Sequence, residues 1–403
     1  NTTGASNTAV GYQAGYSNTT GGSNTAIGET SLYANTTGAT NTAVGRRALE
    51  DNTTGSNHIA MGYGALRNNT TGSNNVALGY LAMDINTTGA SNVAVGFSAL
   101  QANTTASSNT AVGYQAGYAN TTGSLNVAVG SNALDANVTG AANTAVGYNA
   151  LSANTGDGAT AVGKDALELN TSGVNTAVGA NALATVTSGT GNVGIGNDVL
   201  TANTASNNTA VGYQALTANT TASNNTAVGK SALTASTTGR DNTAVGYLSG
   251  TTTTTGFENT AIGMYALRFN TTGDTNTAVG LQALHRNTTA DSNTAVGRNA
   301  MEVNTTGAFN VAVGYGALEK NTTASNNVAV GYLSGYNNTT ASNNAFLGYR
   351  AGFSATTGNL NTFVGNDSGY SMTTGTKNTL LGRYNGNSGG LDIRTSSNNI
   401  VLS

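Results

Sequence analysis

Residues 109–116 read Asn-Thr-Ala-Val-Gly-Tyr-Gln-Ala, and variants of the first five letters recur along nearly the whole 403-residue chain. The block closes on a glycine at 23 places, of which Gly11 is the first and Gly382 the last. Of the 22 spacings between these glycines, 19 are 17 residues and three are 16. Because loops of globular domains tolerate insertions, this regularity predicts units that stack directly on one another.

Positions in each unit are numbered here from the closing glycine as zero. Position −1 is always aliphatic, position −2 is Ala in 19 copies, and position −3 is Thr, Val or Ile in all but one. Position −4 is Asn in 21 copies, and position +4 is Leu in 14, Met in two and Gly in seven. Position +7 is Asn in 17 copies and starts an Asn-Thr-Thr-Gly corner. The shortened copies lose a residue in this corner, near Gly156, Ser172 and Ala205.

The residues before the glycine are β-branched and aliphatic, which favours a short strand in every unit. We therefore expect an all-β fold: a parallel β-solenoid, or β-roll, of 23 stacked coils over residues 1–386. Residues 387–403 depart from the repeat and are expected to begin a different, truncated C-terminal module. Stacked Asn side chains are expected to hydrogen-bond from coil to coil. The expected ladder begins with Asn7, Ala9, Val10, Gly11, Asn24, Gly28, Asn41 and Gly45.

None of the 31 charged residues lies at positions −4 to 0, +3 or +4, which indicates that these seven positions are inside. Side chains alternate across a strand, so −3 and −1 share one face while −4, −2 and 0 share the other. We expect the aliphatic face to pack on the +4 Leu of its own coil. The alanine face is expected to pack against sister chains in a homotrimer, although the spacing itself does not set the count. Phe346, Phe363 and Leu380 replace the −2 alanine and are expected to spread the chains or plug the axis at the end of the shaft.

Composition excludes several classes of function. Only 8% of residues are charged, the net charge is −3, and there is no cysteine. We therefore expect no partnership with nucleic acid, no thiolate metal site and no redox chemistry. No apolar run approaches the roughly 20 residues of a membrane helix. His58 and His285 have no third ligand implied, and no catalytic motif or cofactor signature is found, so we expect neither a metal site nor an enzyme.

Two surface features have competing interpretations. Ten of the 23 +1 positions are Tyr, and this aromatic stripe could bind glycans; Arg46 and Lys164 at the same position favour simple exposed packing instead. The corner asparagines, such as Asn18 and Asn35, lie in Asn-x-Thr triplets that resemble glycosylation acceptors. Their fixed phase favours a turn-forming role. The stripe includes Tyr12, Tyr63, Tyr80, Tyr114, Tyr315 and Tyr332.

The five-residue block resembles the repeats of trimeric autotransporter adhesin heads, which form parallel β-rolls. The longer unit, as in residues 109–116, resembles repeats of bacteriophage tail-fibre shafts. This resemblance implies an extracellular, homotrimeric structural shaft on a virion or similar appendage. It would project a distal module that contacts a host-surface glycan or receptor, without catalytic residues of its own.

Two alternatives remain open. One is a bacterial surface adhesin whose repeats themselves contact the host, as the autotransporter resemblance implies. The other is an ice-binding solenoid, because regular rows of threonine can order water. The −3 threonines are expected to face inward, which disfavours ice binding.

Overall fold

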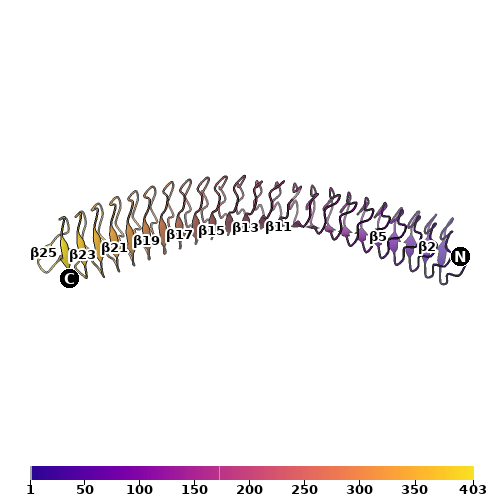
Figure 1. Cartoon of the computed structure of the whole chain (residues 1–403), viewed down its shortest axis with the longest axis horizontal. Coiled ribbons are helices and arrows are strands. Elements are labelled where there is room, and N and C mark those ends of the chain that lie inside the picture. Colours follow the sequence, from indigo (N-terminus) through magenta and orange to yellow (C-terminus); the bar gives the residue numbers. More distant parts are fainter. Residues whose placement is uncertain (1, 172) are drawn as a thin grey trace. The chain divides into compact units, whose positions relative to one another are not determined.

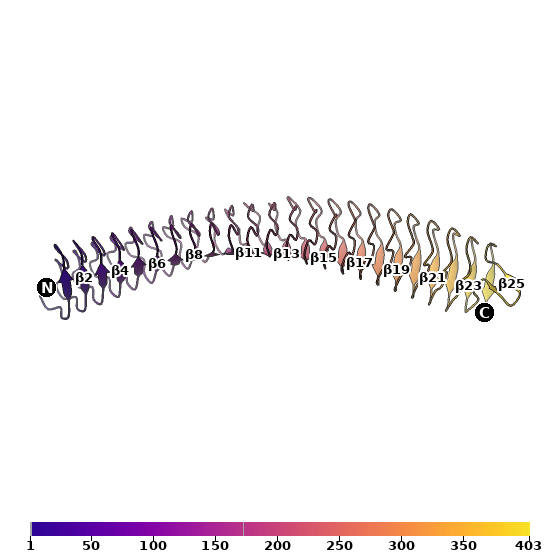
Figure 2. The ribbon, with the colours of Figure 1, turned by 180° about the vertical axis from the view of Figure 1, so that it is seen from behind.

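The computed structural model describes residues 2–171 and 173–403, and it contains strands but no helix in those ranges. It divides into two compact units, Asn1–Thr204 and Ala205–Ser403. In each unit, short strands lie side by side and one lap of chain follows the previous one (Figures 1 and 2). The expected parallel β-solenoid with 23 coils is confirmed.

Every closing glycine is preceded by a three-residue strand at positions −3 to −1. The first unit contains β1 (Thr8–Val10), β2 (Thr25–Ile27), β3 (Thr42–Val44), β4 (Ile59–Met61), β5 (Val76–Leu78), β6 (Val93–Val95), β7 (Thr110–Val112), β8 (Val127–Val129), β9 (Thr144–Val146), β10 (Thr160–Val162), β11 (Thr176–Val178) and β12 (Val193–Ile195). The second contains β13 (Thr209–Val211), β14 (Thr226–Val228), β15 (Thr243–Val245), β16 (Thr260–Ile262), β17 (Thr277–Val279), β18 (Thr294–Val296), β19 (Val311–Val313), β20 (Val328–Val330), β21 (Ala345–Leu347), β22 (Thr362–Val364), β23 (Thr379–Leu381), β24 (Asn387–Ser388), β25 (Leu391–Asp392) and β26 (Ile400–Leu402).

Strands within a unit pair in parallel, and equivalent positions lie opposite each other. Ala111 of β7 pairs with Ala128 of β8, for example. The register survives a shortened coil, because Thr144 of β9 pairs with Thr160 of β10 although only 16 residues separate them. The corner therefore absorbs the deletion near Gly156, as expected. The deletion near Ser172 lies outside the described residues.

The interior of the coil is filled by the alanine face of the strand, and this corrects the expected orientation. The −2 alanines from Ala26 onward are almost fully buried within the single chain, whereas the −3 and −1 side chains point outward. A Cβ atom added at Gly194, the one −2 glycine, would lie 3.1 Å from the +4 Leu183 and 3.3 Å from the +3 Val199. The alanine face thus packs on the +4 leucines of its own chain, and the aliphatic face does not.

The bulky −2 residues near the C-terminus also point into the coil. Phe346, Phe363 and Leu380 are fully buried, so they neither spread sister chains nor plug an axis between them. Each occurs in a coil whose +4 residue is Gly; a Cβ atom on Gly352 would lie 2.5 Å from the Phe346 ring. In these last coils, a larger residue at −2 is therefore matched by a smaller residue at +4. Cores tolerate such volume-conserving exchanges best.

Two buried asparagine ladders hold successive coils together. In the −4 ladder, Asn41 donates its backbone N–H to Oδ1 of Asn24 (2.9 Å) and its Nδ2 to the Gly55 carbonyl (3.0 Å). In the +7 ladder, Nδ2 of Asn52 donates to Oδ1 of Asn35 (2.8 Å) and to the Gly55 carbonyl (2.9 Å). The predicted hydrogen bonding between stacked amides is confirmed. It satisfies buried polar groups that would otherwise cost about 1–3 kcal/mol each.

The closing glycine is required for two reasons. At Gly28, φ is +132°, and an added Cβ atom would lie 2.6 Å from the carbonyl of Gly45 in the next coil. Any other residue would be strained and would push adjacent coils apart. In β1, the first described strand, Ala9 and Val10 are exposed.

The C-terminal segment continues the sheet. β26 pairs in parallel with β23, so that Thr379 lies opposite Ile400, and the connection contains the small antiparallel pair β24–β25. Whether residues 387–403 begin a further module stays a prediction.

Candidate functional site

The outer face of the strands is the most continuous candidate surface in each unit. Position −1 is aliphatic in every coil, and its side chains are partly exposed, as in Val112 (37%) and Ile195 (41%). Position −3, the second outward row, is Thr or an aliphatic residue in every coil. Neither row holds a charged residue. A partly exposed face that has no charged residue in any coil is typical of a surface that another molecule contacts.

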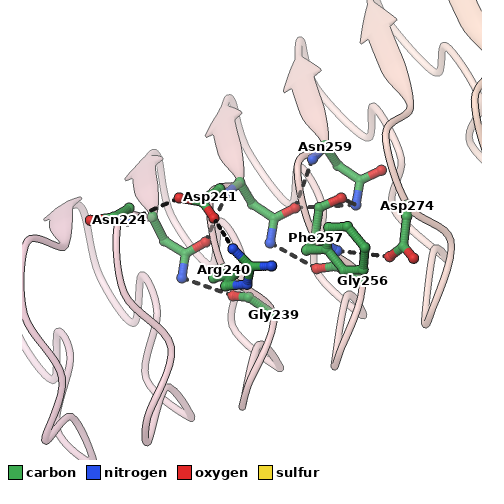
Figure 3. Close-up of polar contacts among 10 residues, drawn as sticks. Asn224, Gly239, Arg240, Asp241, Gly256, Phe257, Asn259 and Asp274 are labelled. Carbon is green, nitrogen blue, oxygen red and sulfur yellow. Dashed lines mark hydrogen bonds and ion pairs between the residues drawn. The ribbon is translucent and has the colours of Figure 1, made fainter.

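Charged and polar side chains gather at the corner that precedes each strand. Figure 3 shows this corner in the second unit, where Arg240 forms a 3.0 Å ion pair with Asp241 and Asn224 donates to the same carboxylate at 3.0 Å. One coil further, the backbone N–H of Phe257 donates to Oδ1 of Asp274 at 2.9 Å.

The contact between Phe257 and Asp274 belongs to a third ladder, at position −6. Ser56 and Ser107 make the same contact, because their Oγ atoms accept N–H bonds from Ala39 and Ala90. This ladder was not predicted from the sequence. The recurrence of Ser or Asp at position −6 was the signal that could have revealed it.

The tyrosines of the +1 stripe stand in columns. Tyr63, Tyr80, Phe97 and Tyr114 stack in sequence with ring centroids 5.1–5.4 Å apart. Tyr315, Tyr332 and Tyr349 form a second column at 5.2–5.3 Å. Tyr12 is also exposed (71%) but stands outside both columns. Within a column each ring face is covered by the next ring, so only the edges meet solvent.

A second aromatic row runs at position +5. Tyr16 stacks on Tyr33 at 5.4 Å, and Phe353 lies between Tyr336 and Tyr370 at 5.2 and 5.0 Å. Because sugars stack on ring faces rather than edges, the interior of a column is poorly suited to hold a glycan. The columns therefore fit the interpretation as exposed packing.

A cation lies over the ring at three of the four ends of the two +1 columns. Arg46 lies over Tyr63 at 5.9 Å, and Arg298 lies over Tyr315 at 5.8 Å. Arg350 lies 4.9 Å from Tyr349 while it forms a 2.8 Å ion pair with Asp367. Cation–π contacts of this kind contribute about 0.5–1 kcal/mol at exposed sites.

The two histidines have different surroundings. His58 replaces an Asn in the −4 ladder and is fully buried; Nε2 contacts the Gly72 carbonyl at 2.8 Å, and Nδ1 accepts the N–H of Asn75 at 3.2 Å. Burial lowers the pKa of His58 to about 4. His285 packs edge-on against Tyr265 and Phe269, and burial lowers its pKa as well.

Among the described residues, no three His, Asp or Glu side chains are grouped closely enough to hold a metal ion. The same residues contain no helix that is long and apolar enough to cross a membrane.

The corner asparagines lie inside the coil. Asn35, Asn86, Asn270 and Asn304 are at most 1% exposed, and Asn18 is 7% exposed. Their amide nitrogens donate within the +7 ladder, as Asn86 does to Asn69 at 2.8 Å. These amides are therefore out of reach of a modifying enzyme in the folded chain.

Comparison with models of known protein families and with curated proteins finds no match to this chain.

Proposed function

We propose that this chain is the structural shaft of an extracellular fibre, most simply the tail fibre of a phage or a similar appendage. Three copies associate, and the shaft carries a receptor-binding part without being an enzyme itself. The observation that supports this proposal is the uncharged, partly exposed face formed by positions −3 and −1. The interface differs from the sequence expectation, because the alanine face is already buried inside each coil.

A second copy of the chain suits this face better than an unrelated partner. The face repeats with the period of the chain itself, so copies match it coil for coil. Covering the exposed part of one Val contributes roughly 1 kcal/mol. Summed over the 11 or 12 coils of one unit, this is roughly 10 kcal/mol per unit, comparable with the about 4–15 kcal/mol cost of association. The interface is therefore effective only because it is long.

The count of three rests on the resemblance to trimeric fibres, since a flat face also suits a pair. Mass measurement of the intact chain under native conditions separates these cases. We expect three chains; a stable single chain would refute the assembly.

A variant tests the face directly. Val228→Lys with Val245→Lys places two cations in the −1 row and should yield single, folded chains. Ala218→Lys with Ala235→Lys adds the same charge at position +6, where Lys320 occurs naturally, and should leave the trimer intact. Equal masses for both variants would show that the −1 row is not the interface.

One observation favours ice binding as a second candidate. The −3 threonines face outward rather than inward, and six successive coils carry Thr at this position: Thr209, Thr226, Thr243, Thr260, Thr277 and Thr294. Rows of hydroxyl and methyl groups spaced about 4.8 Å apart along the stack could order water. Thermal hysteresis produced by a single chain would support ice binding and argue against the trimer, because ice binding and trimer formation use the same face.

A further inference from the structure

The +1 row contains one gap between two tyrosine faces. Tyr114 ends the first aromatic column, the next coil has Ser131 at position +1, and the coil after that has Tyr148. Tyr114 and Tyr148 are each 50% exposed, more than Tyr80 or Phe97 within the column. Coils are about 4.8 Å apart, so the two tyrosine positions lie roughly 10 Å apart with Ser131 at the position between them.

The same arrangement occurs once more in the chain, and there it is filled. Lys230 stands at position +1 between Tyr213 and Tyr247, with its Nζ 5.8 Å from one ring centroid and 6.0 Å from the other. Among the described residues, Tyr63, Tyr213, Tyr247, Tyr315 and Tyr349 all have a cation of this chain over the ring. No such contact is found for Tyr114 or Tyr148 in the described part of the chain.

A carboxylate without an ion-pair partner lies at the corresponding position beside this gap. In an earlier coil, Arg47 at position +2 contacts both Glu50 at +5 (2.6 Å) and Tyr63 at +1 of the next coil. The equivalent three residues at the gap are Asn132, Asp135 and Tyr148. An amide thus occupies the place where the guanidinium stands in the earlier coil.

Asp135 has no ion pair among the described residues, and its Oδ1 is buried without a hydrogen-bond partner. Its bonds are to its own N–H and that of Ala136, and burial raises the pKa of its carboxyl. Lys164, the next cation in the +1 row, is held by Asp165 at 3.2 Å. The gap therefore offers two aromatic faces and a negative charge, without a cation of the chain itself.

We propose that the gap between Tyr114 and Tyr148 is a binding site for an organic ammonium group, with Asp135 as its counter-charge. The ligand class includes quaternary ammonium head groups and protonated amino sugars, which share a compact cation on an apolar frame. Cation–π attraction from two rings, together with one carboxylate, is the recognition chemistry.

The test uses the intact chain at low salt, with choline as the probe and 3,3-dimethyl-1-butanol as its uncharged isostere. Calorimetric titration and ligand-observed NMR should detect choline but not the alcohol. Glucosamine against N-acetylglucosamine then shows whether an amino sugar is accepted as well. Asp135→Asn should weaken choline binding roughly fivefold, the size expected for one partly exposed charge contact.

Ser131→Lys should abolish binding, because the new ammonium fills the gap as Lys230 does in its own coil. Ala180→Lys is the matched control, since it adds the same charge at position +1 of another coil, and it should change affinity less than twofold. Equal binding of the alcohol and choline would overturn the proposal. Unchanged binding in the Ser131→Lys chain would do the same.

Discussion

At the residue scale, the tight lap of the coil depends on left-handed backbone at three positions in nearly every unit. Residues at −5, +2 and +4 have φ near +50 to +60°, as in Thr40 (61°), Arg47 (61°) and Leu49 (53°). The ladder asparagines do not adopt this conformation, so their role is hydrogen bonding rather than the turn expected from sequence. At Leu49, the full burial of the side chain offsets the strain of the left-handed backbone.

Thr40 offers a direct test of this strain. It is β-branched, exposed and left-handed, a combination that sterics disfavour. Asn tolerates this conformation and occurs at the same position as Asn57 and Asn74. We expect Thr40→Asn to raise the free energy of unfolding by about 1 kcal/mol, measured by denaturant titration. A destabilised variant would show that the Thr40 side chain makes a favourable contact.

His58 makes one coil sensitive to acid. Its two ring nitrogens reproduce the donor and the acceptor of the ladder asparagine, which requires the neutral ring. The folded pKa of about 4 lies below the ordinary 6.5, so the unfolded chain binds the proton more readily. Stability is complete above pH 6.5 and is lost as pH falls towards 4, by on the order of 3 kcal/mol.

We expect His58→Asn to remove much of this dependence, because Asn makes the same contacts without titrating. The free energy of unfolding, measured between pH 7 and 4.5, provides the readout. His285 remains as an internal control in that variant. If both chains lose stability in parallel with acid, the ladder histidine is not the sensitive group.

At the scale of the coil, positions −2 and +4 share one volume. Phe346 fits because Gly352 of the same coil and Gly335 of the coil before it leave room; a Cβ atom on either would approach the ring to 2.5–2.6 Å. In most coils the same space is filled by Ala at −2 and Leu at +4. A bulky residue at −2 occurs only with Gly at +4, whereas Ala at −2 occurs with Leu, Met or Gly.

This exchange can be engineered at Ala312. We expect Ala312→Phe alone to destabilise the chain by more than about 3 kcal/mol, because Met301 and Leu318 already fill the space. Met301→Gly with Leu318→Gly should cost about 2–5 kcal/mol for each cavity. The triple variant should be more stable than either, which denaturant titration measures. Simple addition of the separate losses would contradict the shared volume.

The sequence predicted the period, the strands and the alternation of faces, because each is set by local spacing. It did not predict which face of the strand lies inside. Freedom from charge cannot separate a position buried in its own coil from one covered by another chain, and Ala and Val meet that criterion equally. The small size of Ala did not identify the outer face either, because beside a +4 Leu the coil has room at −2 only for a Cβ atom. The pairing of Phe346 with Gly352 was the available signal.

The proposed ammonium site between Tyr114 and Tyr148 was harder to predict. Tyr114 was identified as part of a stripe, but the gap at Ser131 is defined only by what fills the equivalent gaps elsewhere. Asp135 looked like one of many scattered charges. Whether Asp135 has an ion-pair partner depends on residues of neighbouring coils, and the sequence does not show which of these residues lie beside it.

At the scale of the whole molecule, stability is a sum over laps that contact only their neighbours. The ladders satisfy most of the polar groups between successive coils, and apolar side chains at −2 and +4 fill the coils, so a single chain forms its own interior. What it leaves uncovered is the −3 and −1 face. The proposed association would therefore add to a structure that is already folded, instead of completing it.

This arrangement predicts that unfolding depends on chain concentration. If three chains share the outer face, dilution favours separated chains and lowers the unfolding midpoint. With about 0.7 kcal/mol of unfolding enthalpy per residue, the shift is about 1 °C for each tenfold dilution. Calorimetry over a hundredfold range of chain concentration can resolve this shift of the midpoint. The chain with Val228→Lys and Val245→Lys should unfold at a midpoint independent of concentration, because no partner remains to be lost. A midpoint independent of concentration in the unaltered chain would instead mean that the uncharged face stays open to water, where its threonine rows would be free to contact ice.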